Sequence, residues 1–454
     1  MSTRSPDRLL QVVDSVLHSL PDAERYVVAF SGGRDSHVLL WLMAQLRERS
    51  AVPLDAVHVH HGLQEAADTW SSHCEAVCRD LDVPIEIVHV DARPATGQSP
   101  EEAARRARYS VLAERISVGG MLLTAHHQDD QAETVMLQLL RGSGPEGLAA
   151  MPVCSEFGAG IHVRPLLDVS RSEIEDCAQY LGLDWVEDAS NQDRAFARNR
   201  LRHEIIPLLK AHWPAFAKTL ARSAHHCAEA AELLWETAEE DLDRCGIAEL
   251  PRTLSIESLN ALSGARQAQV LRLWVRNQRL RMPTSAHIEQ IRSSVLTVDL
   301  GHHSPQVSWA NVMVRAWRGQ LYLGDKGALC DWAPPDNALL VWSDGVRTLA
   351  LPGGGSLAQI PVEGAGIART CLTKGLVRVR FRSGGERLRL PGETHHRRLK
   401  KLLQDSDIPP WERTRLPLIY IDDELAAVAD RWVCAPFVAS EAEAGVRLVY
   451  TPIE

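Results

Sequence analysis

The sequence predicts an α/β fold: a doubly wound parallel sheet, followed by a mainly helical middle domain and a small α+β C-terminal domain. From residue 26 to about 186, short apolar runs rich in β-branched residues alternate with segments of helical length, which is the pattern of parallel β-α units. An Ala- and Glu-rich helical segment follows over 216–246. A chain of 454 residues exceeds one ordinary core, so we expect domains at 1–215, 216–332 and 333–454.

Composition argues against a membrane protein and a disulfide framework. The chain is 45% hydrophobic and 24% charged, and no stretch approaches the roughly 18 consecutive apolar residues of a membrane helix. Its N-terminus lacks the apolar core of a signal peptide. Nine cysteines occur without a C-x-x-C pair, which is typical of reduced thiols. We therefore expect a cytoplasmic protein.

Positive charge is local rather than global. The formal net charge is −10, which argues against a surface coated for nucleic acid. Residues 374–401 nevertheless carry a local excess of eight positive charges. That segment includes Arg397, Arg398, Lys400 and Lys401, and it predicts a basic patch that contacts RNA phosphates.

The first β-α unit ends in a glycine turn. A helix over 7–20 leads to an apolar strand at 26–30, which stops at Ser31-Gly32-Gly33 before a helix that starts near Asp35. Glycines let a ligand approach the backbone, and a helix N-terminus favours an anion, most simply a phosphate. The turn lacks the lysine of a P-loop and the three glycines of a dinucleotide fingerprint. The alternative is a plain turn with Asp35 as a helix cap.

The next units add basic and imidazole side chains. A second strand at 54–63 places His58 and His60 on one face near its carboxyl end, where open α/β sheets bind ligands. His60 either lines a nucleotide site or is a partly exposed strand residue. After a helix at 66–80 and a strand at 85–90, a helix from Pro100 carries Arg105 and Arg108 on one face. These arginines either clamp phosphate or form a solvated basic face.

An acidic cluster follows the strand predicted at 121–125. On the helix that we expect after it, His126, Asp130 and Glu133 lie at i, i+4 and i+7 and share one face. Carboxylates that converge on a polyphosphate bind Mg²⁺ or activate a nucleophile. Helix capping explains one of the acids without a ligand.

The rest of the chain carries one further basic motif. A strand at 161–167 and a helix at 170–181 are followed by Arg194, Arg198 and Arg202 at i, i+4 and i+8, a stripe that suits RNA phosphates or a nucleotide tail. We expect helix over 253–300 and a β-hairpin with Gly319 near its turn. Short strands and a helix over 395–401 form the C-terminal module.

Several blocks together resemble the tRNA(Ile)-lysidine synthetase family, within the PP-loop superfamily of N-type ATP pyrophosphatases. The first block alone marks only the superfamily, whereas the order of the blocks and the last of them are more specific. The blocks are SGGRDS (31–36), VHVHHGL (57–63), LLTAHHQDDQAET (122–134), RNRLR (198–202) and LKKLLQDSDIPPWER (399–413).

The resemblance implies a ligase that uses ATP. Such an enzyme adenylates the C2 oxygen of the wobble cytidine in a CAU-anticodon isoleucine tRNA and releases pyrophosphate. The ε-amine of free L-lysine then displaces AMP, and the lysidine formed changes codon recognition from AUG to AUA. The family leaves the oligomeric state, a homodimer included, open.

The resemblance also implies roles for single residues. ATP would be held by Ser31, Gly32, Gly33, Arg34, Asp35, Ser36 and His60, with Asp35 and Asp130 binding Mg²⁺ or taking part in catalysis. His126 and Glu133 would position or activate reacting groups. The residues expected to contact tRNA or phosphate are Arg105, Arg108, Arg198, Arg202, Arg397, Arg398, Lys400 and Lys401.

Two rival functions remain as alternatives. A tRNA thiolase of the same superfamily would need a cysteine pair for a cluster or persulfide, and the absence of C-x-x-C counts against it. A nucleotide-sensing or RNA-binding protein with a dead site would be expected to lose Asp35 or Asp130, and the sequence keeps both.

Overall fold

The structure, a computed structural model, divides into two compact units, 1–233 and 234–454. It describes residues 5–49, 51–60, 67–90, 100–187, 193–194, 196–247, 250–297, 304–335, 338–343, 345–406 and 408–453. Residues 61–63 of the predicted second strand lie outside this set.

The first unit contains a six-stranded sheet with the order β3-β2-β1-β4-β6-β5. Its first five members are parallel, as predicted, whereas β5 pairs antiparallel with β6 at one edge. The strands are β1 (Arg25–Ala29), β2 (Leu54–His60), β3 (Ile85–His89), β4 (Gly120–Leu123), β5 (Cys154–Phe157) and β6 (Gly160–Val163). The strand predicted to run to 167 therefore ends at Val163, and β5 was not predicted.

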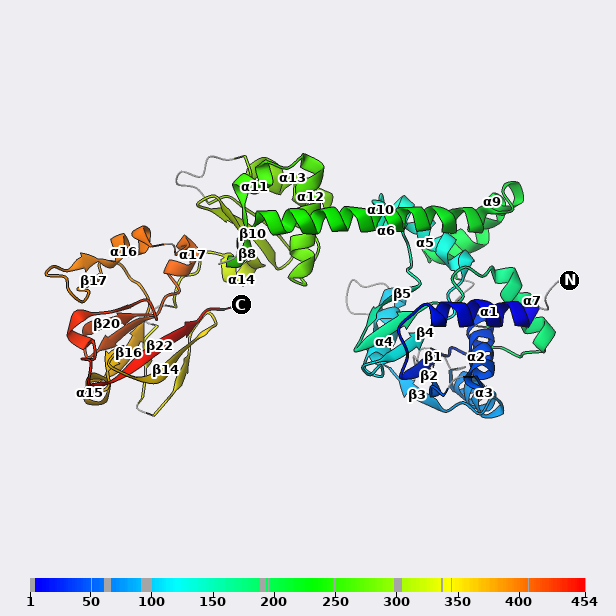
Figure 1. Cartoon of the computed structure of the whole chain (residues 1–454), viewed down its shortest axis with the longest axis horizontal. Coiled ribbons are helices and arrows are strands. Elements are labelled where there is room, and N and C mark those ends of the chain that lie inside the picture. The colour runs from blue at the N-terminus through cyan, green and yellow to red at the C-terminus, as the bar shows by residue number, and fades with distance from the viewer. Residues whose placement is uncertain are drawn as a thin grey trace. The chain divides into compact units, whose positions relative to one another are not determined.

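Helices cover both faces of this sheet, which is the doubly wound arrangement (Figure 1). Adjacent residues of β1 point to opposite faces: Val28 packs with Leu39 of α2, while Val27 packs with Leu112 of α4. The helices are α1 (Ser5–His18), α2 (Arg34–Arg47), α3 (Ala67–Asp80), α4 (Pro100–Ala113), α5 (Gln128–Leu140), α6 (Pro145–Leu148) and α7 (Arg171–Leu181).

The strand order reverses at β1. The chain passes from β1 outward through β2 to β3, then returns to place β4 on the other side of β1. At such a switch point the loops at the carboxyl ends diverge and leave a crevice where ligands bind. The glycine turn follows β1 and the acidic segment follows β4, so the topology brings the two predicted motifs to one edge.

The first unit closes with a series of helices, and the two units divide within the last of them. The long helix predicted over 216–246 is present as α10. The series comprises α8 (Ala197–Arg200), a π-helical turn η2 (Leu201–Ile205), α9 (Ile206–His212) and α10 (Phe216–Cys245). The domain boundaries expected at 215 and 332 stay predictions.

The second unit begins with helices packed on an antiparallel sheet of order β7-β8-β11-β10-β9. The helix expected over 253–300 is interrupted, because β8 runs to Ser255 before the helices start, whereas the hairpin around Gly319 is confirmed. The elements are β7 (Gly246–Ile247), β8 (Leu250–Ser255), α11 (Ile256–Asn260), α12 (Gly264–Asn277), α13 (Ser285–Ser294), β9 (Gln306–Trp309), β10 (Val312–Trp317), β11 (Gln320–Asp325) and α14 (Lys326–Leu329).

Two further sheets, β12-β16-β19-β20-β21 and β13-β14-β22-β15, form the α+β C-terminal part, with a small β17-β18 pair. Trp411 is buried with Met313 and Leu329 of the preceding part. The elements are β12 (Leu340–Val341), β13 (Thr348–Ala350), β14 (Ser356–Glu363), β15 (Ile367–Ala368), α15 (Arg369–Lys374), β16 (Val377–Arg380), β17 (Arg387–Leu388), β18 (Arg397–Arg398), α16 (Leu399–Asp405), α17 (Pro410–Arg413), β19 (Leu418–Ile421), β20 (Glu424–Val428), β21 (Trp432–Val433), η3 (Ala435–Phe437) and β22 (Ala444–Thr451).

Among the described residues, no helix combines the length and the apolar character that crossing a membrane requires.

Candidate active site

The glycine turn between β1 and α2 is held by its own hydroxyl groups. Ser31 Oγ lies 3.0 Å from Ser36 Oγ, and Ser36 Oγ donates a hydrogen bond of 2.9 Å to the Gly33 carbonyl. Gly32 adopts φ +80°, and a Cβ there would lie 3.0 Å from Cys74 Sγ. Glycine is therefore required by both the backbone conformation and the space.

The N-terminus of α2 carries no side-chain cap. The N-cap residue is Gly33, which has no side chain that could cap the helix, and Asp35 lies inside the first turn. The alternative that Asp35 caps α2 is therefore wrong. The N–H groups of a helix start favour an anion, so this turn can accept a phosphate.

Asp35 and Asp130 converge on one imidazole, that of His127. The Nε2 atom of His127 lies 3.6 Å from Asp35 Oδ2 and 3.4 Å from Asp130 Oδ2. Burial alone would raise the pKa of Asp35, but His127 and Arg34 outweigh it and hold the pKa at about 2. The two motifs separated by almost a hundred residues thus meet in space, as the sequence predicts.

The start of α5 differs from the prediction. The helix begins at Gln128 with His127 as its N-cap, and His127 and Asp130 form a reciprocal capping box. His126 therefore precedes the helix and does not share a helical face with Asp130 and Glu133. Its Nδ1 instead lies 2.7 Å from the hydroxyl oxygen of Thr124. Sequence reasoning missed His127, although its i, i+3 spacing to Asp130 is a capping signal.

Glu133 is a buried anchor for two arginines. Its exposure is only 2%. Arg198 Nε donates to one carboxylate oxygen at 2.7 Å, and Arg202 Nε donates to the other at 2.6 Å. Both guanidinium groups also reach Asp130 Oδ1, at 3.2 and 3.1 Å. Two carboxylates and two guanidinium groups therefore surround one another at this edge of the sheet.

The arginines predicted to share one helix face over 194–202 do not all do so, because α8 begins at Ala197 and Arg194 precedes it. Arg194 pairs with Glu204 at 3.4 Å, whereas Arg198 and Arg202 point toward the acids of α5. Burial would lower the pKa of both inner arginines, but the carboxylates of Asp130 and Glu133 outweigh it and raise their pKa. Both side chains stay charged and belong to the site itself.

The predicted site residues His60, Arg105 and Arg108 each contact an aromatic or imidazole ring. The ring of His60, at the end of β2, lies 4.5 Å from that of His89 on the neighbouring β3. The guanidinium carbons of Arg105 and Arg108 lie 4.8 and 5.9 Å from the ring centre of Tyr109. Arg105 is close enough to lower the pKa of His126, which places it beside the site.

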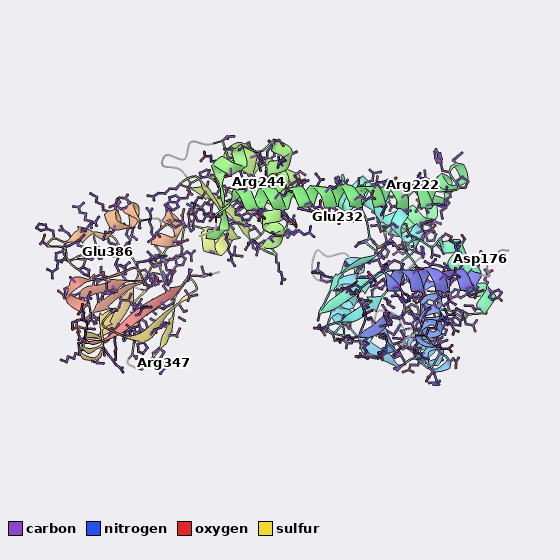
Figure 2. All side chains as sticks on the ribbon, viewed as in Figure 1. Asp176, Arg222, Glu232, Arg244, Arg347 and Glu386 are labelled. Carbon is purple, nitrogen blue, oxygen red and sulfur yellow. The ribbon has the colours of Figure 1, made fainter. Side chains whose placement is uncertain are left out.

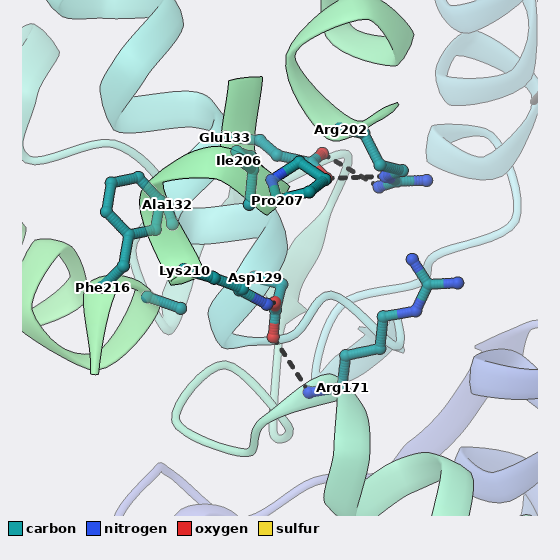
Figure 3. A pocket seen from close by; sticks show the side chains of 10 residues that line it. Asp129, Ala132, Glu133, Arg171, Arg202, Ile206, Pro207, Lys210 and Phe216 are labelled. Atoms are coloured by element: carbon teal, nitrogen blue, oxygen red, sulfur yellow. Dashed lines mark hydrogen bonds and ion pairs between the residues drawn. The ribbon is translucent and has the colours of Figure 1, made fainter. Parts of the chain in front are cut away.

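A small cavity lies next to the acidic cluster, where Asp129 forms an ion pair with Lys210 of α9 (Figure 3). Asp129 also accepts a hydrogen bond of 3.0 Å from the Arg171 backbone. The cavity holds about 180 Å³, which is below the roughly 300 Å³ at which drug-sized ligand pockets begin. Sequence reasoning missed Lys210, which ties α9 to the start of α5.

The basic segment of the C-terminal part is only partly neutralised. Arg397 contacts Glu393 at 3.5 Å and Asp405 at 3.3 Å, whereas Arg398, Lys400 and Lys401 are exposed. The carboxylate of Glu386, one of the residues labelled in Figure 2, accepts hydrogen bonds from the Ser383 and Gly384 backbone and lies 3.9 Å from Arg382. The exposed cations remain directed to solvent and can receive a polyanion.

The chain matches three protein families in series. They are a PP-loop domain over residues 1–209, a TilS substrate binding domain over 254–322 and a TilS substrate C-terminal domain over 377–450.

It is also similar along its length to proteins described as tRNA(Ile)-lysidine synthases. The protein from Methylococcus capsulatus is 42% identical, covering 97% of this chain and 99% of its own length. That from Pseudomonas aeruginosa is 44% identical, with 95% and 94% covered, and that from Coxiella burnetii is 39% identical, with 99% and 97% covered.

Proposed function

This chain belongs to the tRNA(Ile)-lysidine synthase family, and from that premise we propose that it makes lysidine in isoleucine tRNA. It is an ATP-dependent ligase that forms a carbon–nitrogen bond. The C2 oxygen of the wobble cytidine, in a CAU anticodon, attacks the α-phosphorus of ATP, and pyrophosphate leaves. The ε-amine of free lysine then attacks C2, AMP leaves with the oxygen, and the amine loses its protons to solvent.

The observation that carries this proposal is the meeting of the glycine turn with the α5 acids. Asp35 and Asp130 both lie within 3.6 Å of His127 Nε2, so a polyphosphate seated on the turn reaches the acids of both motifs. The uncapped N–H groups of α2 supply donors for phosphate oxygens, while the Ser31 and Ser36 hydroxyls hold the turn in shape. Arg34 is tied to Asp35 by a hydrogen bond of 3.0 Å.

The donor set fits Mg²⁺. Asp35 and Asp130 bring two carboxylates to one place beside His127, and Mg²⁺ is commonly held by one or two carboxylates together with substrate phosphates and water. Asp35 would hold the ion, because its side chain is 35% exposed, and Asp130 would contribute less, because its side chain is 14% exposed and its oxygens contact Arg198, Arg202 and His127. Bound Mg²⁺ would offset phosphate charge.

The acids of α5 act by charge rather than as bases. Burial would raise the pKa of Asp130, but His127, Arg198 and the other neighbouring cations outweigh it and lower the pKa. A carboxylate with a lowered pKa is a poor proton acceptor near neutral pH. We therefore assign Asp130 and Glu133 to holding Arg198 and Arg202 in place, where these arginines contact phosphate oxygens of the nucleotide.

We assign binding of the tRNA body to the second unit. Arg398, Lys400 and Lys401 are exposed on β18 and α16, and clustered cations of this kind bind backbone phosphates. Local positive charge thus allows a protein of net charge −10 to bind RNA.

The test is incorporation of labelled lysine into RNA. The full-length protein is incubated with ATP, Mg²⁺, radiolabelled lysine and an unmodified isoleucine tRNA transcript, with a transcript carrying a different wobble base as control. Label that stays on the cytidine-bearing RNA alone is the expected result. Pyrophosphate release without lysine incorporation would leave only a generic adenylating enzyme.

A further inference from the structure

A buried chain of polar side chains runs behind the active site from β6 to the loop after β4. Arg164 Nη2 lies 3.0 Å from His162 Nδ1, and His162 Nε2 lies 2.8 Å from Thr124 Oγ1. Thr124 Oγ1 in turn lies 2.7 Å from His126 Nδ1. Thr124, His162 and Arg164 are all less than 9% exposed.

The direction of these hydrogen bonds follows from what each group can donate. A guanidinium has no acceptor, so His162 Nδ1 must accept from Arg164. Arg164 itself is fixed by a second bond of 2.8 Å from Nη1 to the Pro152 carbonyl. Neutral His162 therefore carries its proton on Nε2 and donates it to Thr124. Burial and the charge of Arg164 lower the pKa of His162 to about 3, which keeps the ring neutral.

The direction in which the Thr124 hydroxyl donates decides which ring nitrogen of His126 carries the proton. Once its oxygen accepts from His162, its own O–H needs an acceptor, since a buried donor without a partner is unfavourable. Among the described residues, Thr124 Oγ1 has no side-chain or backbone hydrogen-bond neighbour besides the two imidazoles. The hydroxyl therefore donates to His126 Nδ1, and the proton of His126 resides on Nε2.

Three arginines and one carboxylate, that of Asp130, act on the ring of His126. Burial is the largest cause that lowers its pKa, to about 3, and the charges of Arg164, Arg198 and Arg105 act in the same direction against Asp130. A neutral N–H donor among guanidinium groups suits an anionic oxygen. The anion that the turn and the arginines are built to receive is a phosphate.

We propose that Arg164, His162 and Thr124 form a relay that fixes His126 as its Nε2–H tautomer, and that His126 donates this hydrogen bond to a phosphate oxygen of the bound nucleotide. The tautomer stands on hydrogen-bond geometry alone, whereas the role in catalysis rests on the proposed function. Thr124, His162 and Arg164 are positioning residues in this scheme, and His126 is the group that touches the substrate.

The first measurement is the tautomer itself, read from nitrogen NMR shifts of the full-length protein labelled at histidine, with the His126 signals identified by their loss in H126Q. The expected native spectrum has a protonated Nε2 and an unprotonated Nδ1. In Thr124→Val, which keeps the shape but removes the hydroxyl, both nitrogens should shift toward averaged values. A native ring protonated on Nδ1 overturns the relay.

The second measurement is the rate of pyrophosphate release. A lost hydrogen bond to a charged group lowers a rate by about tenfold or more, so T124V should lower kcat about tenfold with KM for ATP changed much less. Thr124→Ser restores the hydroxyl and should restore both kcat and the tautomer. Thr134→Val is the matched control, because that hydroxyl only bonds the Asp130 carbonyl at 2.8 Å on α5; it should leave the tautomer unchanged.

The outcomes separate the two claims. If the native tautomer is as expected but T124V retains the native kcat, the role of His126 in the reaction is wrong. If the native protein releases no pyrophosphate with isoleucine tRNA, the proposed function fails, and the tautomer spectrum still decides the relay.

Discussion

Glu133→Gln removes a carboxylate that both Arg198 and Arg202 contact, while it keeps the side-chain shape. Glu133 is 2% exposed, and the two guanidinium groups donate three hydrogen bonds of 2.6 to 2.9 Å to its oxygens. The amide can accept at one oxygen only, and its NH₂ group faces a guanidinium. Two partly buried cations then share the single charge of Asp130.

The expected loss of stability is large for one substitution. Removing one partner of a buried ion pair costs about 3–5 kcal/mol. The side chains of Arg198 and Arg202 are 23% and 26% exposed, and both keep Asp130, so we expect the lower end, about 3 kcal/mol. For a domain of 150–250 residues this corresponds to a drop of about 6–12 °C in Tm.

The assay is calorimetry of the full-length protein, in which the transition of the first unit is identified by its shift on addition of ATP. The matched control is Glu204→Gln, which breaks an exposed contact of 3.4 Å with Arg194 and should lower the Tm by about 1 °C or less. In the Glu133→Gln background, Arg202→Gln should destabilise less than it does alone, because the pair is already broken. A Tm drop for E133Q no larger than that for E204Q would refute the reasoning.

Four further predictions concern the turn, the acids and the basic patch. Asp35→Asn should abolish pyrophosphate release and leave tRNA affinity within about twofold; an equal loss of both would contradict a role at the nucleotide. Because the pKa of Asp35 is lowered to about 2 in the folded protein, its contribution to stability is present above about pH 4 and is lost as pH falls toward 2; His127→Gln should reduce that loss in acid titrations of unfolding, because only Arg34 then lowers the pKa of Asp35. Gly32→Ala should destabilise the first unit by about 1–2 kcal/mol in urea unfolding, because an L-residue is strained at φ +80°. Replacing Lys400 and Lys401 by Ala should reduce the salt dependence of tRNA binding by up to about two ions, and an unchanged slope would place the RNA elsewhere.

Features that depend on neighbouring residues were predictable from the sequence. The strand before Ser31, the glycine turn and the helix after it are encoded within about twenty residues, and the alternation of such units fixes the parallel sheet. The convergence of Asp35 and Asp130 then follows from topology. The edge strand β5 was missed because its sequence, CSEF, is not an apolar run, and β8 because it runs directly into α11.

Features that depend on distant partners were not predictable. The direction of Arg198 and Arg202 is set by Glu133 and Asp130, which lie more than sixty residues earlier, so the spacing of the arginines alone predicted a basic stripe but not its protein partners. The place of His126 was wrong because α5 starts two residues later than the periodicity implied. Its partner Thr124 directly follows β4 and His162 lies on β6, and only the sheet brings them together.

The widened turn η2 makes the spacing of the chain downstream depend on a single residue. A π-helical turn accommodates one residue more than an α-helical turn would, and here it stands between Arg198 and Lys210, both of which pair with acids of α5. Deleting His203 from it would let the segment wind as regular α-helix and rotate α9 by about 100° about its axis. The ammonium group of Lys210 would then leave Asp129. The number of residues in this turn, as well as their identity, therefore decides whether Arg198 and Lys210 can both form ion pairs with α5.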